Sequence, residues 1–451
     1  MRSGARLGRS VRTGASVALL GLAAACGPVE ESDTNPTDVH AEVSEHISTV
    51  ANVHWKSALP SKGYVEYGPT EELGLNTPIG EEETKSHTQA LIGLKPDTVY
   101  FYRVVSWDGA DAGRSEIESV RTGYLPPGMP ELRLTGTGHD EFIITTLLGQ
   151  SKGILILDPA GNIVWFHDDE DSVLQHYRAR LGRDGKSILY NAADISGEPA
   201  RDSSIVRISF DGSERTATPI TLLAHDFVEH ADGTLGAIVI EDRDGVRGNK
   251  IVEVDPDGNQ TDVWTSWDCF DPTVDMSNDP TLGWTFTNAL DYDSNLDVYY
   301  VSIRNFSSIA RIDRKTGACD WVLGSTASTL EFAQGSARFD HEHQFHIFGN
   351  HLLVMDNEGS LKDNESRVVE YELDFETNVA TEVWRYLSTP PVYTFVLGEP
   401  TRYPNGDTFI NWSTAGQMER VTADGETTWK LNSSAGGVFG FNTLAKNLYE
   451  P

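Results

Sequence analysis

The chain has 451 residues, of which 68 are acidic and 35 are Lys or Arg, so its formal net charge at pH 7 is −33. A surface of this sign repels nucleic-acid phosphates and anionic lipid headgroups, so neither is an expected partner. Any anionic substrate would need a local positive site. The length favours two domains.

The first 26 residues have the pattern of an export signal. The apolar stretch 15–25 follows several arginines, is too short to span a bilayer, and ends at Cys26. The run 22–27 (LAAACG) looks like a bacterial lipobox, in which Cys26 is diacylated. We expect residues 1–25 to be a cleaved lipoprotein signal peptide, with an ordinary signal peptide as the alternative. A lipid anchor at Cys26 implies an extracytoplasmic protein, and Gly27 favours the outer membrane, facing the periplasm or the cell surface.

Residues 26–40 are acidic and contain proline, which predicts a flexible tether. Residues 41–123 alternate as strands do. The segment 94–104 matches the tyrosine-corner pattern of fibronectin type III-like β-sandwiches, with Trp55 as the expected core tryptophan. Such modules space or dock other domains, so we assign this one no chemistry. The proline-rich segment 124–130 predicts a domain boundary.

An internal repeat organises residues 130–451. Six times, an alternating strand runs through an acidic or glycine turn into a second strand. The turns lie 46 to 61 residues apart, at Gly161, Gly212, Gly258, Gly317, Asn378 and Gly425. This is the size of a four-stranded propeller blade. A tryptophan follows five of the turns and is expected to pack the blades: Trp165, Trp264, Trp321, Trp384 and Trp429.

The pattern therefore predicts an all-β protein, with an N-terminal β-sandwich followed by a six-bladed β-propeller. Seven blades remain possible if an outer strand has been misassigned. Between the hairpins, segments with polar or histidine starts should form the innermost strands, so that these starts converge at one mouth of the channel. Cys269 and Cys319 could form a disulfide in an oxidising compartment, but the sequence does not show that they meet.

Several motifs in the repeat region resemble those of the bacterial arylsulfotransferase (aryl-sulfate sulfotransferase) family. The resemblance covers about residues 130–451. The matching segments are 288–293 (NALDYD), 301–305 (VSIRN), 312–317 (IDRKTG), 321–324 (WVLG), 341–345 (HEHQF) and 352–357 (LLVMDN).

The resemblance implies sulfuryl transfer from an aryl sulfate to a phenol through a sulfohistidine, with neither a nucleotide donor nor a cofactor. His343 matches the family histidine that carries the sulfuryl group, and His341 competes with it because a short gap would exchange the two. His225 matches a channel histidine, the acid–base or oxyanion partner. Asn288 and Arg304 match the clamp on the sulfuryl oxygens, a role that suits a guanidinium.

One position departs from the family pattern. The family has His-x-Asn where this chain has Phe286-Thr287-Asn288. A phenylalanine cannot shuttle a proton, and loss of one acid–base group costs about 10²–10⁴ in rate. A catalytically silent propeller that binds an aryl or sulfated ligand, or a protein partner, is therefore the alternative function.

His341 and His343 are two residues apart, so a strand would place both on one face, a spacing that also suits a metal. No further Cys or His stands at ligand spacing, and we therefore predict no metal. The donor and acceptor and the oligomeric state are left open by the sequence.

Overall fold

The computed structural model describes residues 34–107, 112–149, 152–169, 173–195, 202–275, 282–360, 365–434 and 438–450. The predicted signal peptide (1–25), the predicted lipid site Cys26 and most of the predicted tether lie outside these ranges. The described chain is all-β, with short 3-10 helices such as η1 (Ser266–Asp268), η3 (Arg304–Phe306) and η4 (Ser413–Ala415). No described helix has the length and apolar character needed to cross a bilayer.

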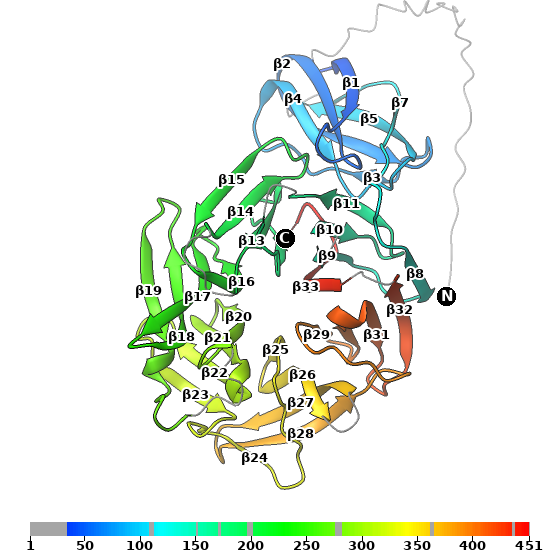
Figure 1. The fold of residues 1–451 in the computed structure, drawn as a ribbon. Coiled ribbons are helices and arrows are strands. Elements are labelled where there is room, and N and C mark those ends of the chain that lie inside the picture. Colours follow the sequence, from blue (N-terminus) through cyan, green and yellow to red (C-terminus); the bar gives the residue numbers. More distant parts are fainter. Residues whose placement is uncertain are drawn as a thin grey trace, which may run out of the picture.

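Six antiparallel sheets surround a common centre, as Figure 1 shows, and confirm the six-bladed propeller. Blade 1 consists of β9 (Phe142–Leu148), β10 (Gly153–Leu157), β11 (Ile163–His167) and β33 (Val438–Ala445). Blade 2 consists of β12 (Ala179–Leu181), β13 (Ser187–Ala192), β14 (Ser204–Ser209) and β15 (Arg215–Pro219). Blade 3 consists of β16 (Leu223–Glu229), β17 (Leu235–Arg243), β18 (Val246–Val254) and β19 (Gln260–Thr265).

The second half of the ring has the same plan. Blade 4 consists of β20 (Thr287–Asp293), β21 (Val298–Ile303), β22 (Ser308–Asp313) and β23 (Cys319–Leu323). Blade 5 consists of β25 (Phe345–Phe348), β26 (His351–Ser360), β27 (Glu365–Asp374), β28 (Val379–Tyr386) and the parallel addition β24 (Glu331–Phe332). Blade 6 consists of β29 (Glu399–Arg402), β30 (Thr408–Asn411), β31 (Gln417–Val421), β32 (Thr427–Ser433) and β8 (Leu132–Gly136).

The two ends of the propeller region close the ring. The C-terminal β33 pairs with β9 as the innermost strand of blade 1, whereas β8, the first strand of the region, pairs with β32 at the outer edge of blade 6. Each terminal strand is thus paired with a strand from the other end of the region, which closes the ring of blades.

Each predicted hairpin forms the third and fourth strands of a blade, counted from the channel, and three of the repeat tryptophans bond to the next blade. Trp165 donates its indole N–H to the carbonyl of Phe210 (2.7 Å), Trp384 to Ala423 (2.9 Å) and Trp429 to Pro159 (3.1 Å). Each acceptor lies in or beside the hairpin turn of the following blade. The repeated tryptophan therefore satisfies its polar atom while its ring fills the space between blades.

The N-terminal strands form a separate unit. They are β1 (Thr37–Val43), β2 (Ala51–Gly68), β3 (Leu75–Asn76), β4 (Thr84–Leu91), β5 (Val99–Trp107), β6 (Ala112–Arg114) and β7 (Glu118–Arg121). The first half of β2 pairs with β1 and β4, and its second half pairs with β3 and β5. Trp55 is buried at the centre of this unit, and the hydroxyl of Tyr100 accepts a hydrogen bond from the Lys95 N–H (3.0 Å).

The prediction of a tether over 26–40 is wrong at its end. β1 begins at Thr37, because the backbone there pairs with β2, as in the register of His40 opposite His54. The composition of residues 26–40 did not predict this strand, because the strand depends on pairing with β2, which follows the next turn.

The N-terminal unit packs against blades 1 and 2. Ile47 and Ile92 share an apolar cluster with Trp165 and Phe210 of the propeller. The hydroxyl of Tyr449 donates to the carbonyl of Ala90 (2.9 Å). In Figure 1 the unit lies next to β11 and β14.

Cys269 and Cys319 form a disulfide with a Cα–Cα distance of 5.9 Å. Cys269 follows η1 at the end of blade 3, and Cys319 begins β23 of blade 4. The bond therefore links two neighbouring blades.

Candidate active site

The centre of the channel is filled by a buried ionic network. The Arg178 guanidinium, just before β12, bonds to Asp226 in β16 (Nε–Oδ1 2.9 Å) and to Glu399 in β29 (Nη1–Oε2 2.8 Å). It also donates to the carbonyl of Asn442 in β33 (2.7 Å). Asp226 accepts two more hydrogen bonds, from the side chain of Gln344 and from the backbone of Leu290. All six inner segments therefore meet in one network, which sequence analysis missed because no local pattern identifies its partners.

The predicted site residues lie around this network at the starts of the inner strands. His225 is in β16, Asn288 is in β20, and His343 lies two residues before β25. Arg304 begins η3, directly after β21. All four side chains are buried, which is unusual for His and Arg and calls for compensating partners.

His343 has a defined tautomer. Its Nδ1 lies 2.9 Å from Oδ1 of Asn357 in β26. The Asn357 amide nitrogen donates to the carbonyls of Thr394 (2.7 Å) and Leu397 (2.9 Å). Carbonyl oxygens only accept hydrogen bonds, so the amide nitrogen must face them and the amide oxygen must face His343. Nδ1 of His343 must then carry the proton, which leaves the lone pair on Nε2. Sequence analysis had noted Asn357 only as part of a motif.

The electrostatic surroundings keep His343 neutral. Burial lowers its pKa well below the usual range, and the neighbouring His225 and the positive charge of Arg304 act in the same direction. The hydrogen bond to Asn357 opposes these effects. A buried neutral imidazole with a free lone pair is a nucleophile rather than an acid.

His225 is held between two aromatic rings. Its ring centroid lies 5.0 Å from that of Tyr177 and 5.0 Å from that of Phe286, with Phe286 edge-on at 77°. Burial, opposed by Asp226 and assisted by Arg304, lowers the pKa of His225 to about 4. Its Nδ1 is buried without a hydrogen-bond partner among the described residues.

Phe286 occupies the site directly. Besides its contact with His225, its ring lies 5.9 Å from the guanidinium carbon of Arg304, within the range of a cation–π interaction. Its backbone is left-handed, with φ 51°, a conformation uncommon outside glycine. The residue that departs from the family pattern therefore lies between the predicted acid–base histidine and the predicted cation.

Asn288 uses its amide donor within the protein. Nδ2 donates to the backbone carbonyl of Glu342 (2.9 Å), in the segment that carries His343. Its Oδ1 is buried and has no hydrogen-bond partner among the described residues. In this arrangement Asn288 presents an acceptor, and it also positions the nucleophile segment.

His341 and His343 do not share a strand face. The strand begins only at Phe345, and His341 has a left-handed backbone with φ 50°, so the alternation of a strand does not apply. Nδ1 of His341 lies 3.1 Å from carboxylate oxygens of both Asp340 and Glu358, and the Asp340 carboxylate raises the pKa of His341. The two imidazoles therefore have different partners.

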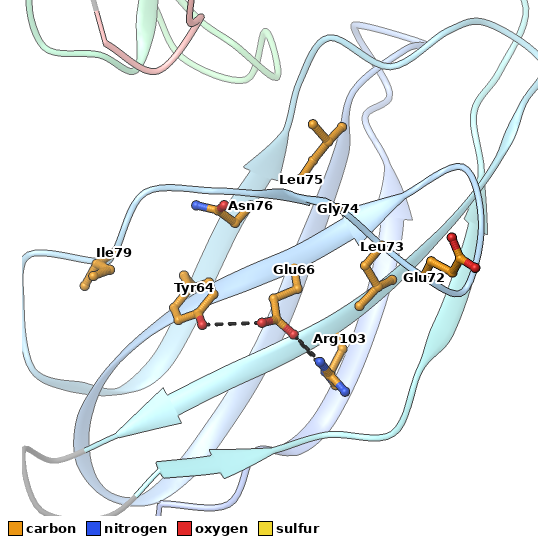
Figure 2. A pocket seen from close by; sticks show the side chains of 9 residues that line it. All are labelled: Tyr64, Glu66, Glu72, Leu73, Gly74, Leu75, Asn76, Ile79 and Arg103. Carbon is orange, nitrogen blue, oxygen red and sulfur yellow. Dashed lines mark hydrogen bonds and ion pairs between the residues drawn. The ribbon is translucent and has the colours of Figure 1, made fainter.

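A cavity in the N-terminal unit has its one cationic side chain paired with a carboxylate. Figure 2 shows the side chains around a cavity of about 450 Å³ in the N-terminal unit. Its Arg103 is ion-paired with Glu66, and Tyr64 contacts the same carboxylate. In the channel, Arg304 lies close to the ring of Phe286, and its Nη1 donates to Oδ1 of Asn305 (3.0 Å).

Comparisons with known proteins give a family match and several solved structures of low similarity. Residues 136–435 match the family model described as arylsulfotransferase (ASST). No curated protein matches the chain significantly. Solved structures similar to it include a protein of unknown function from Bacteroides caccae, with 14% identity and a TM-score of 0.44, covering 68% of this chain and 100% of that chain. A streptogramin B lyase has 14% identity and a TM-score of 0.39, covering 70% and 98%. A luciferin-regenerating enzyme has 10% identity and a TM-score of 0.37, covering 69% and 97%.

The family match spans well over half of the chain and contains all of the channel histidines described above. The protein therefore belongs to the arylsulfotransferase (ASST) family.

Proposed function

We propose that the protein transfers a sulfuryl group from an aryl sulfate to a phenol, with His343 as the covalent carrier. The observation that supports this role over His341 is the hydrogen bond from Nδ1 of His343 to Asn357. It leaves the Nε2 lone pair available in a buried site, whereas His341 has its Nδ1 between two carboxylates.

In the first step, Nε2 of His343 attacks the sulfur. The N–S bond forms as the S–O(aryl) bond breaks, and the aryl oxygen leaves with the bonding pair as a phenolate. The imidazole ring becomes cationic because it keeps its Nδ1 proton. The Asn357 carbonyl accepts that hydrogen bond throughout, and the bond strengthens as the charge develops.

In the second step, the acceptor phenol attacks the same sulfur. Its proton passes to Nδ1 of His225, its oxygen forms the new S–O bond, and the N–S bond returns its electron pair to Nε2. His225 then gives the proton to solvent, from which the phenolate released in the first step is protonated. The low pKa of His225 keeps the ring unprotonated at neutral pH, so it can take the proton, but only as a weak base acting while the new S–O bond forms.

Arg304 supplies the positive charge that a sulfate ester needs in so acidic a chain. A guanidinium presents several donors in one plane, which suits the sulfuryl oxygens. The stacking of Arg304 on Phe286 holds its orientation. Asn288 completes the site through its hold on the Glu342 carbonyl.

The test is incubation with an aryl sulfate, followed by mass measurement of the peptide that contains residues 341–346. We expect the mass of one SO₃ group on His343, its loss on addition of a phenol, and no adduct in His343→Gln. His346→Gln is the matched control, because His346 lies three residues away and accepts a hydrogen bond from the Arg402 backbone. An adduct on His341 would show that His341, and not His343, carries the sulfuryl group. The absence of an adduct on any histidine, together with no transfer to phenol, would refute the proposed enzymatic activity.

Phe286 favours one alternative function. Since it replaces an acid–base residue of the family pattern, the same channel could bind an aryl or sulfated ligand, or a protein partner, without turnover. Saturable binding of the aryl sulfate with no adduct and no transfer would support this second function.

The proposal includes the cellular setting and the N-terminal unit. A lipid on Cys26 would attach the protein to a membrane, facing the periplasm or the cell surface, and the Cys269–Cys319 disulfide agrees with an oxidising compartment. The pairing of β1, β2 and β4 opposite β3, β5 and β7 around Trp55, with the Tyr100 hydrogen bond, supports a fibronectin type III-like sandwich. Release of the protein from membranes by Cys26→Ser would test the anchor.

A further inference from the structure

A second group of ligating side chains lies outside the proposed reaction. Asp340, His341 and Glu358 each offer one donor atom, and the three atoms lie within 4.8 Å of one another. Asp340 and His341 precede β25, and Glu358 is in β26. A backbone hydrogen bond from the Glu358 N–H to the Asp340 carbonyl (3.2 Å) holds the two segments together.

The distances alone would allow ordinary hydrogen bonds, but the directions do not. Nδ1 of His341 is 3.1 Å from Oδ1 of Asp340 and 3.1 Å from Oε2 of Glu358. Nevertheless this buried nitrogen makes no well-directed hydrogen bond to a described residue.

A metal ion produces this arrangement. An ion bound in the imidazole plane at about 2.1 Å, with carboxylate oxygens at a similar distance, separates nitrogen and oxygen by about 3.0–3.4 Å. The two nitrogen–oxygen distances of 3.1 Å at His341 fall in this range. The charges agree as well, since two carboxylates would balance a dication.

The surroundings provide an outer shell and an opening. The hydroxyl of Ser307 donates to Oδ1 of Asp340 (2.7 Å), the oxygen nearest the imidazole, and so orients the carboxylate. Asp340, Glu358 and Ser307 also line a cavity of about 510 Å³, which leaves room for water or a further ligand on the ion.

We propose that Asp340, His341 and Glu358 bind one dication of the Zn²⁺ class, with an open coordination position toward this cavity. One imidazole nitrogen and two carboxylate oxygens suit Zn²⁺, whereas Ca²⁺ takes six to eight oxygen ligands. The site is separate from the His343 carrier, so it does not depend on the proposed sulfuryl transfer.

The test uses the full mature chain without a histidine tag, treated with chelator, dialysed and titrated with Zn²⁺ in a calorimeter. We expect one equivalent to bind and the thermal midpoint to rise. Glu358→Gln and His341→Gln should remove this equivalent, and Ser307→Ala should weaken it by about 10- to 100-fold.

His351→Gln is the matched control. His351 also has a carboxylate beside its Nδ1, from Glu370 at 2.8 Å, but in the geometry of a hydrogen bond. It should bind Zn²⁺ as the wild type does. Circular dichroism of each variant separates loss of the site from loss of the fold. No binding by the folded wild type, equal binding by wild type and His341→Gln, or binding of Ca²⁺ but not Zn²⁺ would overturn the proposal.

Discussion

Nδ1 of His343 lies 2.9 Å from Oδ1 of Asn357, and Asn357 in turn is held by carbonyls of the segment that joins blade 5 to blade 6. The protonation pattern of the proposed carrier is thus set by a residue from another strand. This role is the one that a buried carboxylate has in a serine-protease triad, where it holds the histidine in one tautomer.

Replacing Asn357 with leucine should therefore reduce kcat by about 10²–10⁴, because the proton would no longer be held on Nδ1 of His343 and the positive charge that develops on the ring would lose its hydrogen-bond acceptor. The measurement is transfer from an aryl sulfate to a phenol. Ser366→Ala is the matched control, since the Ser366 hydroxyl contacts the carbonyls of Asn357 and Thr394 but not His343. Equal losses in the two variants would mean that anchoring of the connecting segment matters, and the tautomer does not.

Phe286→His should increase the rate of transfer by about 10²-fold for aryl sulfates whose phenol is a poor leaving group. The rate should change little for aryl sulfates whose phenol leaves readily as a phenolate. The added imidazole could donate a proton to the aryl oxygen, and histidine tolerates the left-handed backbone better than most residues. Phe286→Leu is the control, because it removes the aromatic ring without adding a group that can donate a proton. A uniform change across the donor series in both variants would contradict a proton-transfer role.

Stability should fall between pH 6.5 and 4. The folded-state pKa of His225 is about 4, below the ordinary value of 6.5, so its contribution is full above pH 6.5 and is lost as the pH falls through 4. For one such group the loss between pH 7.5 and pH 5 is about 2 kcal/mol. His139 and His167, whose pKa burial also lowers to about 4, contribute in the same direction.

The check is urea unfolding of wild type and His225→Gln at both pH values. The variant should lose about 2 kcal/mol less than the wild type over this interval, because groups common to both proteins cancel. An identical loss in the two proteins would show that His225 can be protonated without cost in the folded state.

Arg178→Met should destabilise the protein by about 3–5 kcal/mol, because it removes the only cationic partner of Glu399 among the described residues and leaves the buried Asp226 with Arg180 alone, at 3.5 Å. Arg121→Met is the control, since Arg121 pairs with Asp97 at the surface and its loss should cost little. Urea midpoints compare the two. Similar costs would mean that the central network is not what holds the inner strands together.

Removal of the disulfide by Cys269→Ala with Cys319→Ala should cost about 4 kcal/mol, from the loop of 50 residues that the bond closes. A reducing agent should lower the unfolding midpoint of the wild type and leave that of the double variant unchanged. Any response of the double variant to reduction would point to another thiol.

The period of the repeat determined the architecture before any tertiary information. Strand alternation and turn glycines are local properties, and six regularly spaced hairpins have few ways to bury their apolar faces other than by packing side by side in a ring. Local patterns in the sequence also predicted that Trp55 is a core residue of the N-terminal unit. They did not predict the strand that begins at Thr37, because that strand forms by pairing with β2, which follows it in the chain.

The site divides in the same way. The sequence by itself determined which residues have suitable chemistry, among them His225, Arg304 and His343, since residue types and motif spacing are written along the chain. Only the tertiary structure decided their states. The tautomer of His343 depends on Asn357, the placement of Phe286 on the rings around it, and the separation of His341 from His343 on a left-handed backbone. These depend on atoms that lie far apart in the chain, and burial and hydrogen-bond direction arise only when the blades come together.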